Sequence, residues 1–153
     1  MQLLHQNQFP TPKPIDTNRH AILMSLVDGD TLCHIQRITS QAEIKNIFEK
    51  TLEMLIRFAK NGLIHGDYNE FNLMVNADGT KLTVIDFPQC ISVKHPNAAS
   101  YFNRDVECVF IYFDKLAEKS FEEKAEQEEG DMKKEEKFNV SDYEMPILED
   151  IQI

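Results

Sequence analysis

Three oxygen-bearing side chains, those of Asp67, Asn72 and Asp86, have the types and spacing needed for chemistry. Asp67 and Asn72 lie five positions apart in the polar stretch 62–72, and Asp86 follows a short apolar run. Mg²⁺ prefers hard oxygen ligands and is usually held by one or two protein carboxylates together with waters and substrate phosphates. The pattern predicts a magnesium site in which Asn72 and Asp86 are the ligands.

Asp67 has a separate predicted role, beside the group that accepts a phosphoryl group. A carboxylate that stays off the metal can orient the acceptor and take its proton, as the Asp of a His-x-Asp loop does in phosphoryl transfer. Such a base contributes about 10²–10⁴ in rate. A lone Asp or Asn in a loop is usually a turn or cap residue, so the prediction rests on the whole constellation.

A long amphipathic helix is predicted immediately before this stretch. From Ile44 onward the apolar residues recur at helical spacing, which predicts a helix over about residues 41–60. Ser40 and Glu43 have the spacing of a capping box, and Gly62 lies where such a helix would end.

A β-hairpin is predicted after the polar stretch. The short apolar runs 73–75 and 82–85 flank the pair Asp78-Gly79, which is a strong short-range hairpin signal. With a helix before the loop and Asp86 at the end of the second strand, this order of elements would bring the three polar side chains to one end of a small sheet.

The remaining apolar runs predict two more elements. Residues 20–27 form a short apolar run that is followed by the turn residues 28–30, which predicts a buried strand. Residues 98–116 have helical spacing, which predicts a second helix, or a helix pair broken near residues 103–105. Arg104 and Asp105 are interpreted as a structural pair that supports the polar loop from this helix.

The motif His-Gly-Asp-Tyr-Asn-Glu-Phe-Asn at 65–72, followed by Ile-Asp-Phe-Pro-Gln at 85–89, resembles the catalytic and metal-binding loops of the RIO kinases. The resemblance is to the second RIO subfamily, in which Pro replaces the Gly of Asp-Phe-Gly. Flanking residues are similar too, so the resemblance covers about residues 9–113. It implies an α+β, kinase-like C-terminal lobe with the hinge and the last strands of an N-terminal lobe that is largely missing.

The resemblance also implies an activity, which is ATP- and Mg²⁺-dependent transfer to serine or threonine, or ATP hydrolysis. Asp67 would be the catalytic Asp, Asn72 and Asp86 would bind the metal and the nucleotide phosphates, and Asp86 would carry a transient aspartyl-phosphate. Met24 would be the gatekeeper, and Ser25 and Val27 would belong to the hinge that binds adenine. The family's role would place the chain in maturation of the small ribosomal subunit (pre-40S), with pre-40S proteins as partners.

The sequence departs from a complete kinase in its phosphate-binding half. A kinase needs a phosphate-covering loop, a strand Lys and a helix Glu, and none of these is found. The five glycines of the chain are not clustered as such a loop would require. The winged-helix domain with which the second RIO subfamily begins is not found either. We expect a truncated or split product with weak ATP binding, rather than one whose missing half comes from another polypeptide.

Composition and charge predict how the chain is divided into regions and in which compartment it occurs. Of the net charge of −10, residues 114–153 carry 14 acidic and 6 basic side chains. We expect a lead-in at 1–8, the kinase-like domain at 9–118 and an acidic, disordered tail at 119–153. The sequence has no basic stripe, so direct nucleic-acid binding is not expected. A signal peptide and a membrane span are not expected either. The three scattered cysteines favour a reducing compartment, so a cytoplasmic protein that can shuttle through the nucleus is expected.

Two alternatives stay open. One is a catalytically inactive interaction fragment, or pseudokinase. The other is a small-molecule phosphotransferase of the aminoglycoside or choline kinase type, which also uses His-Gly-Asp with an Asn five residues later. The sequence Phe87-Pro88-Gln89 favours the RIO resemblance over this second alternative.

Overall fold

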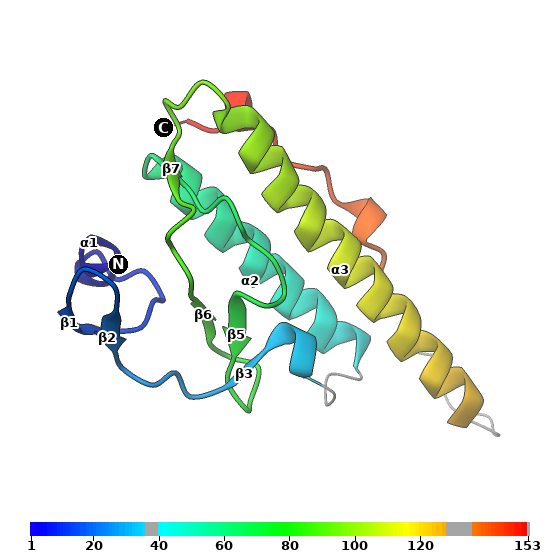
Figure 1. Cartoon of the computed structure of the whole chain (residues 1–153). Helices are drawn as coiled ribbons and strands as arrows, with labels where there is room; N and C mark the ends of the chain where they lie inside the picture. The colour runs from blue at the N-terminus through cyan, green and yellow to red at the C-terminus, as the bar shows by residue number, and fades with distance from the viewer. Residues whose placement is uncertain (36–39, 128–135, 153) are drawn as a thin grey trace.

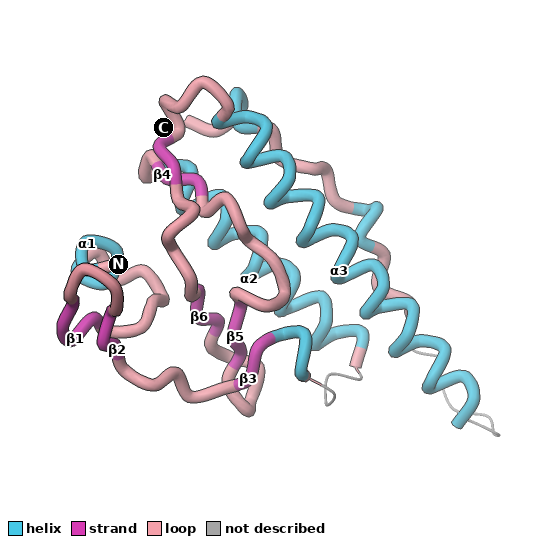
Figure 2. The backbone as a smooth tube through the Cα atoms, viewed as in Figure 1, coloured by secondary structure: helices cyan, strands magenta, loops and turns pink. Residues whose placement is uncertain are grey.

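Two long antiparallel helices form the scaffold, and small two- and three-stranded sheets lie along one side of it (Figure 1). The computed structural model describes residues 1–35, 40–127 and 136–152. The helices are α2 (Gln41–Lys60) and α3 (Ala98–Gln127). Figure 2 shows that the strands are short and that loops make up much of the chain between the two helices. The expected α+β class is confirmed.

The shorter elements occur between and around these helices. In chain order they are α1 (Gln2–Gln6), β1 (Pro14–Thr17), β2 (Ile22–Met24), β3 (Asp30–Thr31), the 3-10 helix η1 (Leu32–His34), β4 (Leu63–Ile64), β5 (Leu73–Val75), β6 (Leu82–Val84), β7 (Ile91–Ser92), and the 3-10 helices η2 (Val140–Asp142) and η3 (Leu148–Asp150). All strand pairs are antiparallel, in the sheets β1-β2, β3-β5-β6 and β4-β7.

Helix α2 has the predicted bounds and buries its apolar face. Ile44, Phe48 and Phe58 are fully buried, because residues three and four apart share one side of a helix. Ser40 is the N-cap, but its side chain makes no capping hydrogen bond, so the predicted capping box is wrong in that respect. Gly62 follows the helix with φ of 82°, the left-handed conformation expected after a helix end.

The predicted hairpin is β5-β6, with Leu73 opposite Val84. Its turn is held by side chains, since the Thr80 N–H donates to Asp78 Oδ1 at 2.9 Å and the Lys81 N–H donates to Asn76 Oδ1 at 2.7 Å. This is the ordinary way in which Asx residues stabilise turns.

The prediction that residues 20–27 form a buried strand is wrong. Strand β2 exists, but Ile22, Leu23 and Met24 are 53, 58 and 40% exposed, and Leu26 is 98% exposed. The only described strand that pairs with β2 is β1, and Figure 1 shows this ladder apart from the β5-β6 hairpin. An apolar run predicts burial only where another layer covers it, and no described element covers this one.

Helix α3 is continuous, so the prediction of a single second helix is confirmed and the alternative, a helix pair broken near residues 103–105, is wrong. Asp105 is buried and its carboxylate binds N–H groups of another segment. Because that side chain bonds outside the helix, it does not compete with the helical backbone as Asp commonly does.

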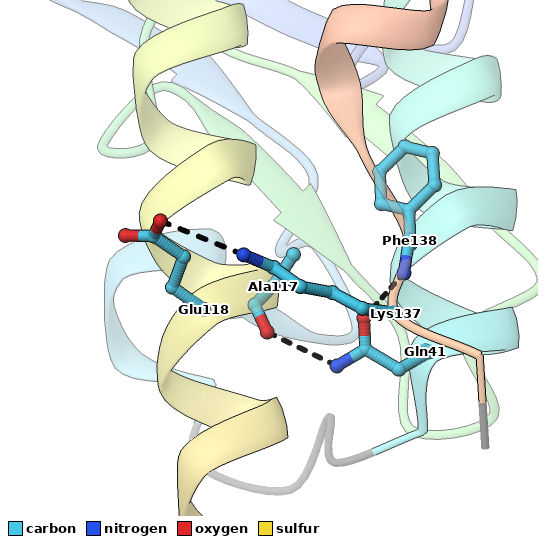
Figure 3. A network of polar contacts seen from close by, with 5 residues as sticks. All are labelled: Gln41, Ala117, Glu118, Lys137 and Phe138. Atoms are coloured by element: carbon cyan, nitrogen blue, oxygen red, sulfur yellow. Dashed lines mark hydrogen bonds and ion pairs between the residues drawn. The ribbon is translucent and has the colours of Figure 1, made fainter. Parts of the chain in front are cut away.

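The expectation of a disordered tail at 119–153 is wrong for residues 119–127, which belong to α3, and for residues 136–152, here called the C-terminal strap. The rest of that tail, residues 128–135 and 153, lies outside the described residues. Phe138, Val140 and Leu148 are buried in the core, and the ring of Phe138 lies 5.5 Å from that of Phe48. Figure 3 shows how the strap is joined to both long helices. The prediction is based on the charged average composition of the tail. These few apolar residues nevertheless bury enough surface to pack the segment against the core.

The side chain of Gln41 is the central link in this junction (Figure 3). Its Nε2 donates to the Ala117 oxygen on α3 at 3.0 Å, and its Oε1 accepts the Phe138 N–H at 2.9 Å. An ion pair between Lys137 and Glu118, at 3.5 Å, lies beside it. Gln41 is buried, so these bonds meet the hydrogen-bonding needs of its amide in the interior.

Candidate active site

The polar loop between β4 and β5 holds Asp67 and Asn72 together, and residues 65–72 are called the catalytic loop below. Asn72 Nδ2 donates to the Asp67 main-chain oxygen at 2.9 Å and to Asp67 Oδ2 at 3.1 Å. Asn69 Nδ2 donates to Asp67 Oδ1 at 2.8 Å. Both oxygens of the Asp67 carboxylate are therefore held by side-chain amides, which fixes the orientation of this half-buried group.

Helix α3 supports the catalytic loop through Asp105. Its carboxylate accepts the Gly66 N–H at 2.7 Å and the Tyr68 N–H at 3.1 Å, and the Arg104 guanidinium donates to the Gly66 oxygen. The interpretation of Arg104 and Asp105 as supports of the loop is confirmed. Burial raises the pKa of Asp105 and outweighs the lowering effect of the two N–H groups.

Tyr68 ties the catalytic loop to helix α2. Its side chain is fully buried and its hydroxyl donates to the Thr51 oxygen at 3.0 Å. Burial raises the pKa of Tyr68 well above its ordinary value, so the hydroxyl stays protonated and remains a donor. The loop is thus anchored to both long helices.

His65 joins the catalytic loop to the segment that carries Asp86, residues 85–90, called the metal loop below. Nε2 of His65 lies 3.1 Å from the Ile85 oxygen, and the Ile85 N–H donates to the Asn72 oxygen at 3.0 Å. Burial lowers the pKa of His65 more than the nearby carboxylates raise it. A neutral His65 that donates from Nε2 fits this geometry.

Asp86 lies directly after this junction. Its φ is 66°, in the left-handed region that residues other than Gly seldom adopt, and it is exposed. Backbone conformations of this kind cost about 1–3 kcal/mol and are frequent at active sites. Against the larger lowering effect of burial on the pKa of His65, the negative charges of Asp105, Asp67 and Asp86 each raise it.

The donor set fits Mg²⁺ by its chemistry. The described residues contain no cluster of three or more His, Cys, Asp or Glu side chains that could hold a metal. Among them, no metal site is therefore formed by such protein ligands alone. Asn72 and Asp86 provide one amide and one carboxylate oxygen, the small hard-oxygen set on which Mg²⁺ relies when phosphates and waters complete its shell. Their roles as ligands stay predictions.

The predicted adenine-binding residues lie on another part of the chain, at the end of β2. Ser25 is bound to the stretch before β1, because its N–H donates to the Lys13 oxygen at 2.9 Å and its Oγ accepts the Lys13 N–H at 2.9 Å. Met24 is 40% exposed, and Val27 is half-buried. The gatekeeper and hinge roles of Met24, Ser25 and Val27 stay predictions.

Gln89 is a site residue that sequence reasoning missed. Its Nε2 donates to Asp67 Oδ2 at 3.3 Å. In the sequence it was only part of a family motif, and its position three residues after Asp86 gave no reason to expect a contact with Asp67.

The sequence of the chain matches a family model and is similar to those of known proteins. A family model described as RIO domain matches residues 1–126. The chain is 46% identical over 115 residues to serine/threonine-protein kinase rio2 of Schizosaccharomyces pombe, covering 75% of this chain and 32% of that protein. It is 40% identical over 106 residues to the Rio2 kinase of Methanocaldococcus jannaschii, covering 68% of this chain and 39% of that protein.

Two solved structures are similar in three dimensions. The Rio2 kinase-ADP/Mg²⁺-phosphoaspartate complex from Chaetomium thermophilum has a TM-score of 0.76 and 31% identity, covering 99% of this chain and 40% of that one. A granulovirus kinase, PK-1 of Cydia pomonella granulovirus, has a TM-score of 0.59 and 19% identity, covering 75% of this chain and 52% of that one. The second likeness supports the kinase-like fold alone. The chain thus spans less than half the length of the Rio2 proteins described above.

Proposed function

The chain belongs to the RIO domain family, and on this basis we propose that it is the metal- and acceptor-binding part of an ATP- and Mg²⁺-dependent serine/threonine kinase or ATPase. The observation that carries the proposal is the hydrogen bonding of Asn72 to Asp67 and to the backbone that leads into Asp86. It holds the proposed base against the amide and joins the catalytic loop to the residue before Asp86. The family match disfavours a small-molecule phosphotransferase.

In this proposal each residue of the site has one task. Asp67, held on both oxygens by Asn69 and Asn72, orients the acceptor hydroxyl and takes its proton. Asn72 and Asp86 would hold Mg²⁺, which when bound neutralises charge on the transferring phosphates. His65 and Asp105 keep the two loops in place, since a shift of about 1 Å in such a site can cost about 10² in rate.

A covalent form of the reaction would use Asp86 itself as acceptor. A carboxylate oxygen of Asp86 would bond to the γ-phosphorus of ATP, the bond to the ADP oxygen would break, and water would later release phosphate. What supports it is that the similar Chaetomium structure is a phosphoaspartate complex. Hydroxylamine-sensitive phosphate on the chain, lost in Asp86→Asn, is the expected result.

The main experiment is calorimetric titration of the full chain with ATP, with and without Mg²⁺, combined with turnover. We expect Asp67→Ala to lose turnover while nucleotide binding largely survives, and Asp86→Ala to lose the Mg²⁺-dependent part of binding. Equal binding and turnover in the parent and both variants would refute the proposal. A parent chain with neither measurable ATP binding nor turnover would favour the alternative, a catalytically inactive interaction fragment.

We further propose the family's setting for this chain, which is cytoplasmic maturation of the small ribosomal subunit with pre-40S proteins as partners and shuttling through the nucleus. The support is family membership alone. The described helices include none that is both long and apolar enough to cross a membrane. Sedimentation of cell extracts tests the setting, because a tagged chain should move with pre-40S particles, and sedimentation with free protein only would contradict it.

A further inference from the structure

Gln89 touches the catalytic loop with both its side chain and its main chain. The side-chain Nε2 donates to Asp67 Oδ2 at 3.3 Å. The Gln89 main-chain oxygen lies so close to Gly66 that a Cβ on Gly66 would come within 2.6 Å of it. Gly66 also has φ of 80°, so the approach of the two loops depends on Gly at this position.

The other amide donors to Asp67 have a different origin. Asn69 and Asn72 belong to the catalytic loop itself, so their bonds fix Asp67 relative to its own loop. Gln89 belongs to the metal loop, three residues after Asp86. Its bond therefore fixes Asp67 relative to the segment that carries the other carboxylate.

We propose that Gln89 is a positioning residue that couples the metal loop to Asp67, so that the catalytic base and Asp86 keep one relative position. This inference rests on the proposed function, because it assigns Gln89 to that reaction. A neutral amide suits the task. It donates to the carboxylate without forming the ion pair that a Lys or Arg would make, and so leaves the base free to accept a proton.

Two nearly isosteric replacements separate coupling from simple packing. Gln89→Met keeps the length of the side chain and loses the donor, and Gln89→Glu also places a like charge beside Asp67. We expect kcat to fall about tenfold in Gln89→Met and further in Gln89→Glu, with KM for MgATP within about twofold. The exposed residue Gln152 gives the control Gln152→Ala, which should match the parent protein. A kcat equal to that of the parent in both Gln89→Met and Gln89→Glu would overturn the proposal. An equal loss of kcat in the two variants would overturn it as well.

Hydrogen exchange supplies a readout that does not depend on turnover. The Phe71 N–H donates to Asn69 Oδ1 at 3.0 Å and the Asn72 N–H donates to the Asn69 oxygen at 3.0 Å, so both report on the order of the catalytic loop. We expect faster exchange of both in Gln89→Met, with the α2 amides unchanged. Unchanged exchange at Phe71 and Asn72 would overturn the coupling. If the parent chain has no turnover and Gln89→Met still shows the faster exchange, the proposed function is refuted while the contact of Gln89 stays supported.

Discussion

The side-chain amide of Asn72 donates to both the main-chain oxygen and the carboxylate of Asp67, at 2.9 and 3.1 Å. The nitrogen of this amide is thus committed to Asp67. The amide oxygen of Asn72 is the atom that the proposal assigns to a cation. One residue would therefore orient the base and bind the metal.

Replacing Asn72 can separate these two tasks. Asn72→Asp keeps an oxygen ligand and loses the donor, so we expect Mg²⁺-dependent nucleotide binding to persist while turnover falls at least tenfold, because a second carboxylate faces Asp67. Asn72→Ala should lose both. Calorimetry with steady-state kinetics measures the two effects. Loss of binding in Asn72→Asp equal to that in Asn72→Ala would contradict the separation.

Replacing Asp105 should loosen the catalytic loop. Asp105→Ala leaves the buried N–H groups of Gly66 and Tyr68 without their acceptor, and an unpaired buried group costs about 1–3 kcal/mol. We expect the free energy of unfolding in urea to fall by about that amount or more. Asp114→Ala, at an exposed position on the same helix, is the control and should change little. A stability of Asp105→Ala equal to that of the control would show that the loop needs no support from α3.

The raised pKa of Asp105 predicts a specific pH dependence. Since burial raises the pKa of this carboxyl above its unfolded value, its contribution to stability is fully present below the unfolded pKa and is lost as the pH rises through the folded pKa. The difference in unfolding free energy between the parent and Asp105→Asn should therefore change in favour of Asp105→Asn as the pH rises through that range. Urea titrations at several pH values measure it, and a pH-independent difference would show that the pKa is not raised.

Gln41 should control the attachment of the C-terminal strap. Gln41→Glu loses the donor to the Ala117 oxygen and places a charge at a buried position that is 3% exposed, which we expect to cost about 1–3 kcal/mol. Hydrogen exchange of the Phe138 N–H should become faster. Asn46→Asp, on the exposed face of the same helix, makes the same chemical change and should leave the strap in place. Equal exchange in the two variants would mean that Gln41 does not hold the strap.

Tyr143 predicts a response of the strap to alkaline pH. Its hydroxyl donates to Glu49 Oε1, and this bond raises the pKa of Tyr143 to about 12. Because the folded pKa is the higher one, the stabilisation is present below the unfolded pKa of about 10 and is lost as the pH rises toward the folded value. The parent should therefore lose its stability advantage over Tyr143→Phe between these values. Absorbance titration of the phenolate checks the pKa directly, and Glu49→Gln should lower it.

Local patterns were sufficient for the elements whose signals lie within a few residues. The 3.6-residue periodicity from Ile44 predicted α2, and Asp78-Gly79 predicted the β5-β6 hairpin, because both depend on contacts between near neighbours. The family could also be inferred from the motif at 65–72 with Asp86, since the order of chemical groups along a loop is visible in the sequence.

Other features depended on segments that are far apart in the chain. The bond between Gln41 and Phe138 spans 97 positions, so nothing near either residue showed that the strap would fold. The exposure of β2 and the continuity of α3 were likewise decided by which neighbours are present, not by the composition of the segment.

The sequence by itself determined the chemical groups of the site and the local elements that carry them, because residue type and short-range spacing are enough for both. Only the tertiary structure decided that Gln89 reaches Asp67 and that Asp105 supports Gly66. Those contacts follow from the packing of α3 and the β6-β7 connection against one loop, and a hydrogen bond depends on the final positions of atoms rather than on their order in the chain.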